Sequence, residues 1–292
     1  MINDNNMRFS LPPGKRLGLF LCIWVLCYII GSILMALILS GGITAVRLRL
    51  GLIFQDLVLF VVPALVTALM ITRRPSDFLM IEKKPGLTPV LLVLLVLVAS
   101  APLMNCIISW NQSLTLPESL HSVELWMREA EKSAEANLSL VTGDTTVGGL
   151  VIGILIIGVL AGFSEELFFR GTLQRLIQTA SINVHVAVWL AAVVFSAAHI
   201  QFFGFIPRLL LGAFFGYAAV WSGSLWLAVL GHIFNNSIAL TIGWCKLRNP
   251  SSGIDLNAVG TTASGGDVAI VIVSLLLTIA GLYLLRRSLK AC

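Results

Sequence analysis

The feature that most constrains this chain is a series of apolar runs, each about as long as a membrane span and free or nearly free of charge. The clearest of them, residues 17–39, contains no Asp, Glu, Lys or Arg. A helix needs about 20 apolar residues to cross a hydrocarbon core of about 30 Å. The 292 residues include only 19 Lys and Arg and 14 Asp and Glu, whereas about a quarter of the residues in a soluble protein are charged. We therefore expect an integral membrane protein.

Eight spans are predicted, so the fold class is all-α, a polytopic helix bundle of about eight transmembrane helices. The first run, 17–39, is longer than the ~7–15 apolar residues of a signal peptide, so we expect it to be retained as an anchor. The others are 51–71, 88–110, 145–162 with a charged extension at 164–176, 184–203, two spans within 209–245, and 268–285. The last pair is expected to break at Ser222, Gly223 and Ser224. Because no repeat or second soluble domain is visible, residues 1–292 are expected to form a single integral membrane domain.

The distribution of Lys and Arg predicts the orientation of the chain. An even number of spans places both termini on one side of the membrane. With a cytoplasmic N-terminus, the cytoplasmic segments contain Arg8, Lys15, Arg16, Arg73, Arg74, Lys83, Lys84, Arg170, Arg175, Arg286, Arg287 and Lys290, and the outer segments contain Arg47, Arg49, Arg128, Lys132, Arg208, Lys246 and Arg248. Because cytoplasmic segments are enriched in Lys and Arg, we predict a multi-pass protein of the inner (cytoplasmic) cell membrane with both termini cytoplasmic. Membrane lipids are expected partners, and nucleic acid is not, because no basic stripe with interleaved aromatic residues occurs.

Very few ionisable side chains lie inside the predicted spans. A charged residue at the centre of a spanning helix costs at least roughly 2.5–3.5 kcal/mol on insertion scales, so such residues are candidates for function. The acids there are Asp56, Glu165 and Glu166, and two histidines, His199 and His232, lie deep in apolar sequence. This small set is the candidate site.

Residues 162–176, GFSEELFFRGTLQRL, place two acids near an arginine. Glu166 and Arg170 are four residues apart, so they share a helix face and can pair. Glu165 lies about 100° further round the helix and cannot share that partner equally, which leaves its carboxylate available as a base. A purely structural role, a buried ion pair that holds the bundle together, would explain Glu166 and Arg170 but not Glu165.

Two further spans carry polar side chains at helical spacing. Phe195 and His199 are four apart in FSAAHI, and His232 and Asn236 are four apart in GHIFNN. A single histidine in an apolar helix is more often a structural core residue than a ligand or a catalyst. Two histidines, a carboxamide and a spare carboxylate on three helices favour a polar site inside the bundle, because such sites are built from inward side chains on facing helices. Structural glue between the helices is the alternative.

Together these motifs resemble those of a known family. EELFFR (165–170), FSAAH (195–199) and HIFNN (232–236) are similar to the EExxxR, FxxxH and HxxxN motifs of the CAAX prenyl endopeptidase and bacteriocin-processing (CPBP) membrane proteases, also called the Rce1-like or Abi family. The resemblance covers about residues 147–242, the motif-bearing protease core, whereas the other spans are supported by hydropathy alone. It implies an eight-helix intramembrane endopeptidase whose polar site opens toward the cytosolic half of the bilayer.

The resemblance also implies roles for the matching residues. Glu165 and His199 would activate a water for attack on the scissile carbonyl of a membrane-associated or lipidated protein or peptide. His232 and Asn236 would stabilise the oxyanion. The remaining matches are Glu166, which belongs to the catalytic set, and the supporting residues Arg170 and Phe195. Nothing in the sequence decides whether the substrate is prenylated.

These residues could activate water with or without a bound metal ion. Glu165, His199 and His232 are also legitimate ligands of zinc or another divalent metal, which would lower the pKa of a bound water to about 7. The HExxH pattern of helical zinc proteases is absent, and neither a cysteine nor a third buried histidine completes a conventional ligand set. We therefore expect no metal and no other cofactor.

Other interpretations concern the whole chain and two of its features. A non-enzymatic membrane carrier or a bacteriocin-immunity binding protein could use the same polar cluster. The acidic segment 111–144 predicts a short amphipathic helix, either a connector at the membrane interface or a lid that guides substrate. Asp56 lies either at the outer interface near Arg47 or Arg49, or in the interior of the bundle.

Overall fold

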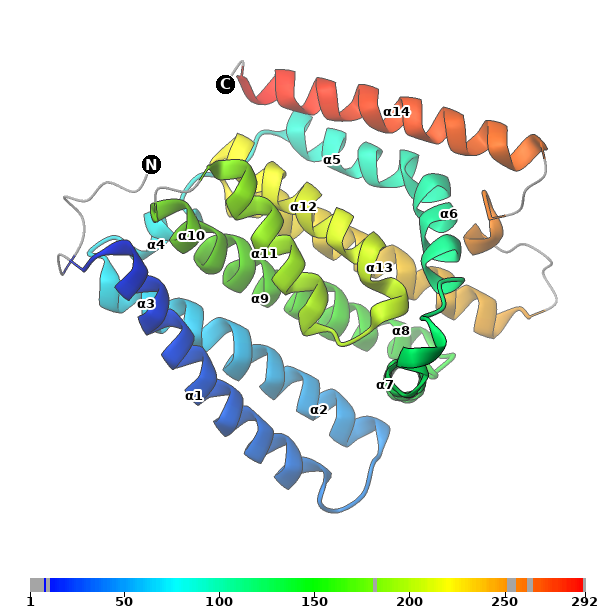
Figure 1. The fold of residues 1–292 in the computed structure, drawn as a ribbon, viewed down its shortest axis with the longest axis horizontal. Helices are drawn as coiled ribbons and strands as arrows, with labels where there is room; N and C mark the ends of the chain where they lie inside the picture. Colours follow the sequence, from blue (N-terminus) through cyan, green and yellow to red (C-terminus); the bar gives the residue numbers. More distant parts are fainter. Residues whose placement is uncertain (1–7, 9–10, 181–182, 251–255, 262–264, 291–292) are drawn as a thin grey trace.

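A computed structural model of the chain describes residue 8 and residues 11–180, 183–250, 256–261 and 265–290. Within this part every regular element is a helix. Most of the long helices lie side by side and alternate in direction, so their ends gather at two opposite ends of the bundle (Figure 1). The predicted fold class, an all-α polytopic bundle, is confirmed.

The N-terminal part is a helical hairpin followed by a bent pair of helices. α1 (Pro13–Leu39) packs against a continuous return helix made of α2 (Ala45–Gln55), the π-helical η2 (Asp56–Val61) and α3 (Val62–Ile71). The short α4 (Pro75–Phe78) leads to α5 (Leu87–Ala99) and α6 (Ala101–Gln112), which meet at a bend of 47°. The bend lies beside Pro102, because a proline ring cannot continue the regular hydrogen-bond ladder of a helix.

The rest of the chain contains one interfacial helix and the helices of the centre. The acidic segment forms η3 (Glu118–Leu120) and α7 (His121–Thr142). One continuous helix then comprises α8 (Val147–Gly153), the π-helical η4 (Ile154–Leu160), α9 (Ala161–Phe168), the π-helical η5 (Phe169–Gln174) and α10 (Arg175–Thr179). It is followed by α11 (Val184–Ala198), η6 (Phe202–Gly204), α12 (Phe205–Ser222), α13 (Leu225–Arg248), η7 (Leu256–Ala258) and α14 (Gly265–Lys290).

Fewer than eight of the described helices are long and apolar enough to cross a membrane on their own. Six described helices are long and apolar enough to cross a membrane: Pro13–Leu39, Ala45–Ile71, Val147–Thr179, Phe202–Ser222, Leu225–Arg248 and Gly266–Lys290. The bent pair α5 and α6 makes a seventh if it counts as one span. In the run 184–203, however, α11 ends after 15 residues, which at ~1.5 Å per residue covers about 22 Å. The helix ends because Ile200 adopts a left-handed conformation, with a φ of 54°.

Two other expectations about the spans can be compared with the structure. The break at Ser222, Gly223 and Ser224 is confirmed, since Gly223 ends α12 with a φ of 62°, a conformation that glycine adopts without strain. The prediction that the fourth span runs on into the extension 164–176 is confirmed, because both lie in one continuous helix. The EELFFR motif therefore lies inside a helix of 33 residues, Val147–Thr179.

The amphipathic helix predicted in the acidic segment is confirmed as α7. Its first turns are anchored by Glu124, which accepts a hydrogen bond from the Leu116 backbone at 2.8 Å and pairs with Arg128 at 2.6 Å. The bond from Leu116 and the pairing with Arg128 hold the pKa of Glu124 below its usual value. At the other end of α7, Arg49 of α2 donates to the carbonyl of Val141 at 2.8 Å. α7 is thus tied to the bundle at both ends.

The core lies between α1, α3, α9, α12 and α13. Phe168 is at its centre, in ring contact with Phe20 and Phe60 at centroid distances of 4.9 and 5.4 Å. The outer faces of the bundle are also apolar: Leu26 and Leu37 of α1 are 58% and 65% exposed. Such surfaces are typical of a protein surrounded by lipid rather than by water.

Candidate active site

Three helices bring the predicted polar residues together. α9 carries Glu165, α11 ends one residue before His199, and α13 carries His232. At Gly162 of α9, an added Cβ would lie only 3.2 Å from the backbone nitrogen of Ile233 in α13. The absence of a side chain at this glycine therefore permits the close approach of α9 to α13. The segments η4 and η5 on either side of α9 are π-helical, an irregularity that is frequent at functional sites.

Arg170, Glu166 and His232 form a buried, hydrogen-bonded chain. Arg170 Nη1 donates to Glu166 Oε1 at 2.7 Å with both side chains fully buried, so the ion pair expected from their spacing forms. The same oxygen accepts from His232 Nδ1 at 2.8 Å. The other end of the guanidinium donates to the carbonyl of Gly212 at 2.8 Å, and its carbon lies 4.6 Å from the ring centroid of Phe195. Because buried charges are stable only when paired in this way, the chain holds His232 in place.

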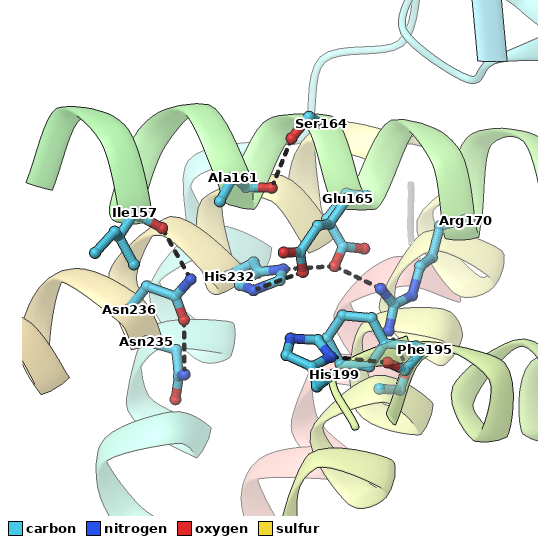
Figure 2. A network of polar contacts seen from close by, with 12 residues as sticks. Ile157, Ala161, Ser164, Glu165, Arg170, Phe195, His199, His232, Asn235 and Asn236 are labelled. Carbon is cyan, nitrogen blue, oxygen red and sulfur yellow. Dashed lines mark hydrogen bonds and ion pairs between the residues drawn. The ribbon is translucent and has the colours of Figure 1, made fainter. Parts of the chain in front are cut away.

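The ring of His232 is fixed on two sides. Phe215 stacks on it, with ring centroids 5.1 Å apart and an interplanar angle of 17°. An ionised carboxylate can only accept hydrogen bonds, so Nδ1 carries the proton in the bond to Glu166. The other ring nitrogen, Nε2, lies 3.8 Å from Glu165 Oε2. His232 therefore stands between the two glutamates, as Figure 2 shows for its position beside Glu165.

Glu165 has an environment different from that of Glu166. Its Oε2 atom has no hydrogen-bond partner among the described residues, and its side chain is 13% exposed along the wall of a cavity. Glu166 is 0% exposed, and although its Oε2 is also unpaired, its Oε1 already binds two donors. Glu165 is consequently the carboxylate that a water in the cavity can reach.

His199 lies at the end of α11 and lines the same cavity. Its Nδ1 is 2.9 Å from the carbonyl oxygen of Phe195. Because a carbonyl oxygen only accepts hydrogen bonds, Nδ1 carries the proton and Nε2 keeps a lone pair. The four-residue spacing of the FSAAH motif thus determines which nitrogen of His199 can act as an acceptor.

Asn236 lies one helical turn beyond His232 on α13 and also lines the cavity. Its Nδ2 donates to the carbonyl of Ile157 at 3.0 Å, and its Oδ1 accepts from Asn235 at 3.3 Å (Figure 2). An amide nitrogen carries two protons, so one N–H of Asn236 is left for a ligand. Ile157 belongs to the π-helical η4, which links this irregularity directly to the site.

The cavity has a volume of about 360 Å³, which lies within the range of small-molecule and peptide sites, roughly 300–1,000 Å³. Its inner wall includes Glu165, Phe195, His199, Phe215, His232 and Asn236. Gln112 is exposed and Glu131, Gly204 and Arg208 are partly exposed where they line the cavity near the end of α6 and the start of α12, and we call this part its mouth. The structure therefore brings all three motifs to one cavity, where they are positioned by Glu166 and Arg170 behind its wall.

The mouth residues were not identified from the sequence. Glu131 of α7 accepts a hydrogen bond from the Phe203 backbone at 3.3 Å. Arg208 of α12 donates to the carbonyl and the side-chain oxygen of Gln201 at 3.2 and 3.0 Å. In the sequence, Glu131 is one of several acids in an amphipathic segment, and Arg208 is a single arginine beside a long uncharged run. Neither indicates a cavity without knowledge of how α7 and α12 pack.

Asp56 belongs to the interior of the bundle, the second of the two alternatives. It is 5% exposed in η2, which packs on α9, and it lies within electrostatic reach of Glu165. Arg47 and Arg49 are bonded elsewhere, to the carbonyls of Gly42 and Val141. Asp56 is therefore not an interfacial partner of these arginines.

The residues considered as metal ligands, Glu165, His199 and His232, all line this cavity. His232 Nε2 and Glu165 Oε2 are 3.8 Å apart, and Nδ1 of each histidine is hydrogen-bonded to a protein oxygen, so Nε2 is the ring atom of each histidine that could meet a ligand. Among the described residues, no group of three or more His, Cys, Asp or Glu side chains converges in a geometry that could hold a metal.

The mouth of the cavity lies at the end of the bundle opposite to the ends of α1 and α14 that are nearest the termini. It is formed where α6 ends, α7 crosses and α12 begins, whereas α1 begins and α14 ends on the other side (Figure 1). The two orientations expected from the sequence, cytoplasmic termini and a site open to the cytosol, are therefore incompatible with each other.

Comparison with known proteins agrees with the motifs. Residues 147–238 match the family model described as "Type II CAAX prenyl endopeptidase Rce1-like". The chain is 26% identical over 99 residues to the uncharacterized protein YpbD of Bacillus subtilis (strain 168), a region that covers 32% of this chain and 46% of that protein. The aligned region thus spans about half the length of this relative. No solved structure matches the chain.

Proposed function

We propose that this chain, whose residues 147–238 match the Rce1-like family model, is an intramembrane endopeptidase that hydrolyses a peptide bond of a membrane-associated or lipidated protein or peptide. One observation carries the proposal. Of two adjacent glutamates, Glu166 is fully buried and bonded to Arg170 and His232, whereas Glu165 is partly exposed and lines a cavity that two histidines share.

The first step is the activation of water. Glu165 accepts a proton from a water in the cavity, while the lone pair on His199 Nε2 accepts a hydrogen bond from the remaining O–H and orients the oxygen toward the scissile carbonyl. General base catalysis of this kind contributes about 10²–10⁴-fold to a rate. The hydrogen bond from His199 Nδ1 to Phe195 supports this role, because in the neutral imidazole it places the proton on Nδ1 and leaves the lone pair on Nε2.

The second step is the stabilisation of the oxyanion. The free N–H of Asn236 and, in its protonated form, Nε2 of His232 are the donors at the cavity wall. Each oxyanion donor is typically worth roughly 2.7–4 kcal/mol when it acts in a water-poor site. Glu166 and Arg170 contribute as positioning residues, since they hold His232 through Nδ1.

The third step is the collapse of the tetrahedral intermediate. The carbon–nitrogen bond breaks, and Glu165, now a carboxylic acid, returns its proton to the leaving amine. The products are a new carboxylate, which contains the oxygen of the water, and a new amino terminus. Glu165 is again ionised at the end of the cycle, so the reaction needs no further reactant.

The experiment compares the membrane peptides released in cells that contain the wild-type chain or Glu165→Gln. A matched control is Glu135→Gln, which makes the same chemical change on the exposed face of α7. We expect juxtamembrane and C-terminal cleavage products to be lost in Glu165→Gln, with a decrease in rate of about 10²–10⁴-fold, and to persist in Glu135→Gln. Mass spectrometry of isolated membranes, with and without a chelator, measures both effects, and we expect the chelator to leave cleavage unchanged.

Three outcomes would contradict the proposal. Cleavage by Glu165→Gln at the wild-type rate would show that this carboxylate is not the base. A cellular phenotype that Glu165→Gln restores in full, with no cleavage products in the wild type, would instead favour a carrier or an immunity protein. Loss of cleavage in the presence of the chelator would assign Glu165, His199 and His232 to a metal site.

A further inference from the structure

The two ends of the bundle can be distinguished by the contacts that hold them. One end, which we call the terminal end, contains the start of α1, the segment 72–86, the turn 222–225 and the end of α14. Arg8 Nε donates to the carbonyl of Thr72 at 3.1 Å, Trp226 Nε1 donates to the carbonyl of Ile81 at 2.8 Å, and the Arg286 guanidinium lies 5.9 Å from the ring of Trp221. These bonds place segments that are distant in sequence on one side of the molecule.

The other end, which we call the mouth end, contains the turn between α1 and α2, α7, the turn between α11 and α12, and the end of α13. Here Asn111 Nδ2 donates to the carbonyl of Phe202 at 3.2 Å, Arg49 reaches Val141 of α7, and Trp244 Nε1 donates to the carbonyl of Thr146 at 3.2 Å. The cavity mouth, with Glu131 of α7 and Arg208 of α12, belongs to this end.

The two ends differ strongly in charge. Among the described residues, the basic side chains at the terminal end are Arg8, Lys15, Arg16, Arg73, Arg74, Lys83, Lys84, Arg175, Arg286, Arg287 and Lys290, and the acidic ones there are Asp77 and Glu82. At the mouth end, the basic side chains are Arg47, Arg49, Arg128, Lys132, Arg208, Lys246 and Arg248, and the acidic ones are Glu118, Glu124, Glu129, Glu131, Glu135, Asp144 and Asp267. The terminal end is thus strongly basic, while the charges at the mouth end balance.

The basic end of a multi-pass protein faces the cytoplasm, because short cytoplasmic segments are enriched in Lys and Arg and the inner leaflet is anionic. From this asymmetry and the position of the mouth, we infer that the proteolytic cavity opens on the non-cytoplasmic face of the membrane. Its substrate is a polypeptide segment presented at that face. This inference rests on the proposed function and replaces the cytosolic opening that the motif resemblance implied.

The structure of the mouth agrees with entry of a polypeptide from an aqueous surface. α7 lies across the mouth end with an exposed acidic face, and its Trp126 packs against Phe202 at a centroid distance of 5.4 Å. Glu131 and Arg208 place one charge of each sign at the opening. A polypeptide backbone with mixed side chains finds both donors and acceptors there.

The test is the labelling of single cysteines in intact cells with a membrane-impermeant maleimide. In a chain whose native cysteines are replaced by serine, Glu82→Cys reports the terminal end and Glu135→Cys the mouth end, and both sites are exposed and outside the cavity lining. We expect Glu135→Cys to be labelled in intact cells to the level reached after permeabilisation. Glu82→Cys should be labelled only after permeabilisation. The reverse pattern would overturn the inference.

A second measurement covers the case in which the cysteine-free chain does not fold. Fusion of the otherwise unchanged chain at its C-terminus to green fluorescent protein or to alkaline phosphatase should give fluorescence and no phosphatase activity. An active phosphatase fusion without fluorescence would place the terminal end outside and overturn the inference. Neither experiment depends on cleavage, so the loss of activity in Glu165→Gln tests the proposed function separately.

Discussion

The N-terminal hairpin and the motif-bearing helices differ in how much of their surface is buried and in the polar residues that they carry. α1 contains the window with the lowest buried share among the candidate spans, 11%, and its exposed face is almost entirely apolar, whereas the corresponding window of Phe202–Ser222 is 44% buried. α9 and its π-helical flanks carry a fully buried arginine and glutamate. In lipid an exposed leucine costs nothing, but a polar group must find a partner within the protein. The contacts that require particular residues are therefore concentrated in the polar centre.

This contrast predicts its largest effect on stability at Arg170. Arg170→Leu leaves Glu166 buried without its cation, and loss of one partner of a buried pair costs about 3–5 kcal/mol. The end of α14 offers the matched control, since Arg287 is exposed and Arg287→Leu should change the free energy of unfolding by less than about 0.5 kcal/mol. Denaturant unfolding in detergent measures both variants. Equal stability of the two would mean that the chain from Arg170 to His232 does not hold the centre together.

A smaller effect is expected on catalysis at Asn236. Asn236→Ala removes an oxyanion donor, which typically lowers kcat by about 10²–10³-fold. Asn235→Ala is the control at the neighbouring position. Asn235 Nδ2 donates to Asn236 Oδ1 at 3.3 Å, so this variant keeps the amide of Asn236 and should lower the rate less. Cleavage rates in proteoliposomes distinguish the two variants. A decrease for Asn235→Ala as large as that for Asn236→Ala would indicate that the amides act only by packing α13.

The smallest effect is expected on the lipid-facing side of the hairpin. Leu37 is 65% exposed, so Leu37→Ala creates no cavity, and we expect a change of less than about 0.5 kcal/mol in the free energy of unfolding. Phe20 of the same helix is fully buried, and Phe20→Ala should cost about 3–5 kcal/mol. Thermal unfolding of the two variants in the same detergent tests whether α1 has one structural face and one lipid face.

Local patterns in the sequence predicted much of the centre, because they depend on spacing along one helix. The pairing of Glu166 with Arg170 follows from a separation of four residues, and the structure contains it. The break at Gly223 follows from residues that favour a turn. The meeting of Glu166 with His232, 66 residues further along the chain, could be suggested only by the resemblance of the motifs.

What could not be predicted depends on packing between helices. α11 ends at Ala198 because the chain reverses at Ile200, although the apolar run continues. The cavity mouth arises where α7 meets the start of α12, and neither Glu131 nor Arg208 belongs to a recognisable motif. Asp56 faces the interior because η2 packs on α9. Such contacts between distant helices leave no periodic signal in either partner.

The central claim is that Glu165 activates water directly, and a single-turnover cleavage in water labelled with ¹⁸O tests it most directly. We predict that the wild-type chain places the heavy oxygen in the new carboxyl terminus during the first turnover and that Glu165→Gln gives no product on the same timescale, although it binds substrate and remains folded. Light oxygen in the first-turnover product would mean that a carboxylate of the protein, and not water, attacks the carbonyl. That result, or unchanged cleavage by Glu165→Gln, would contradict the account.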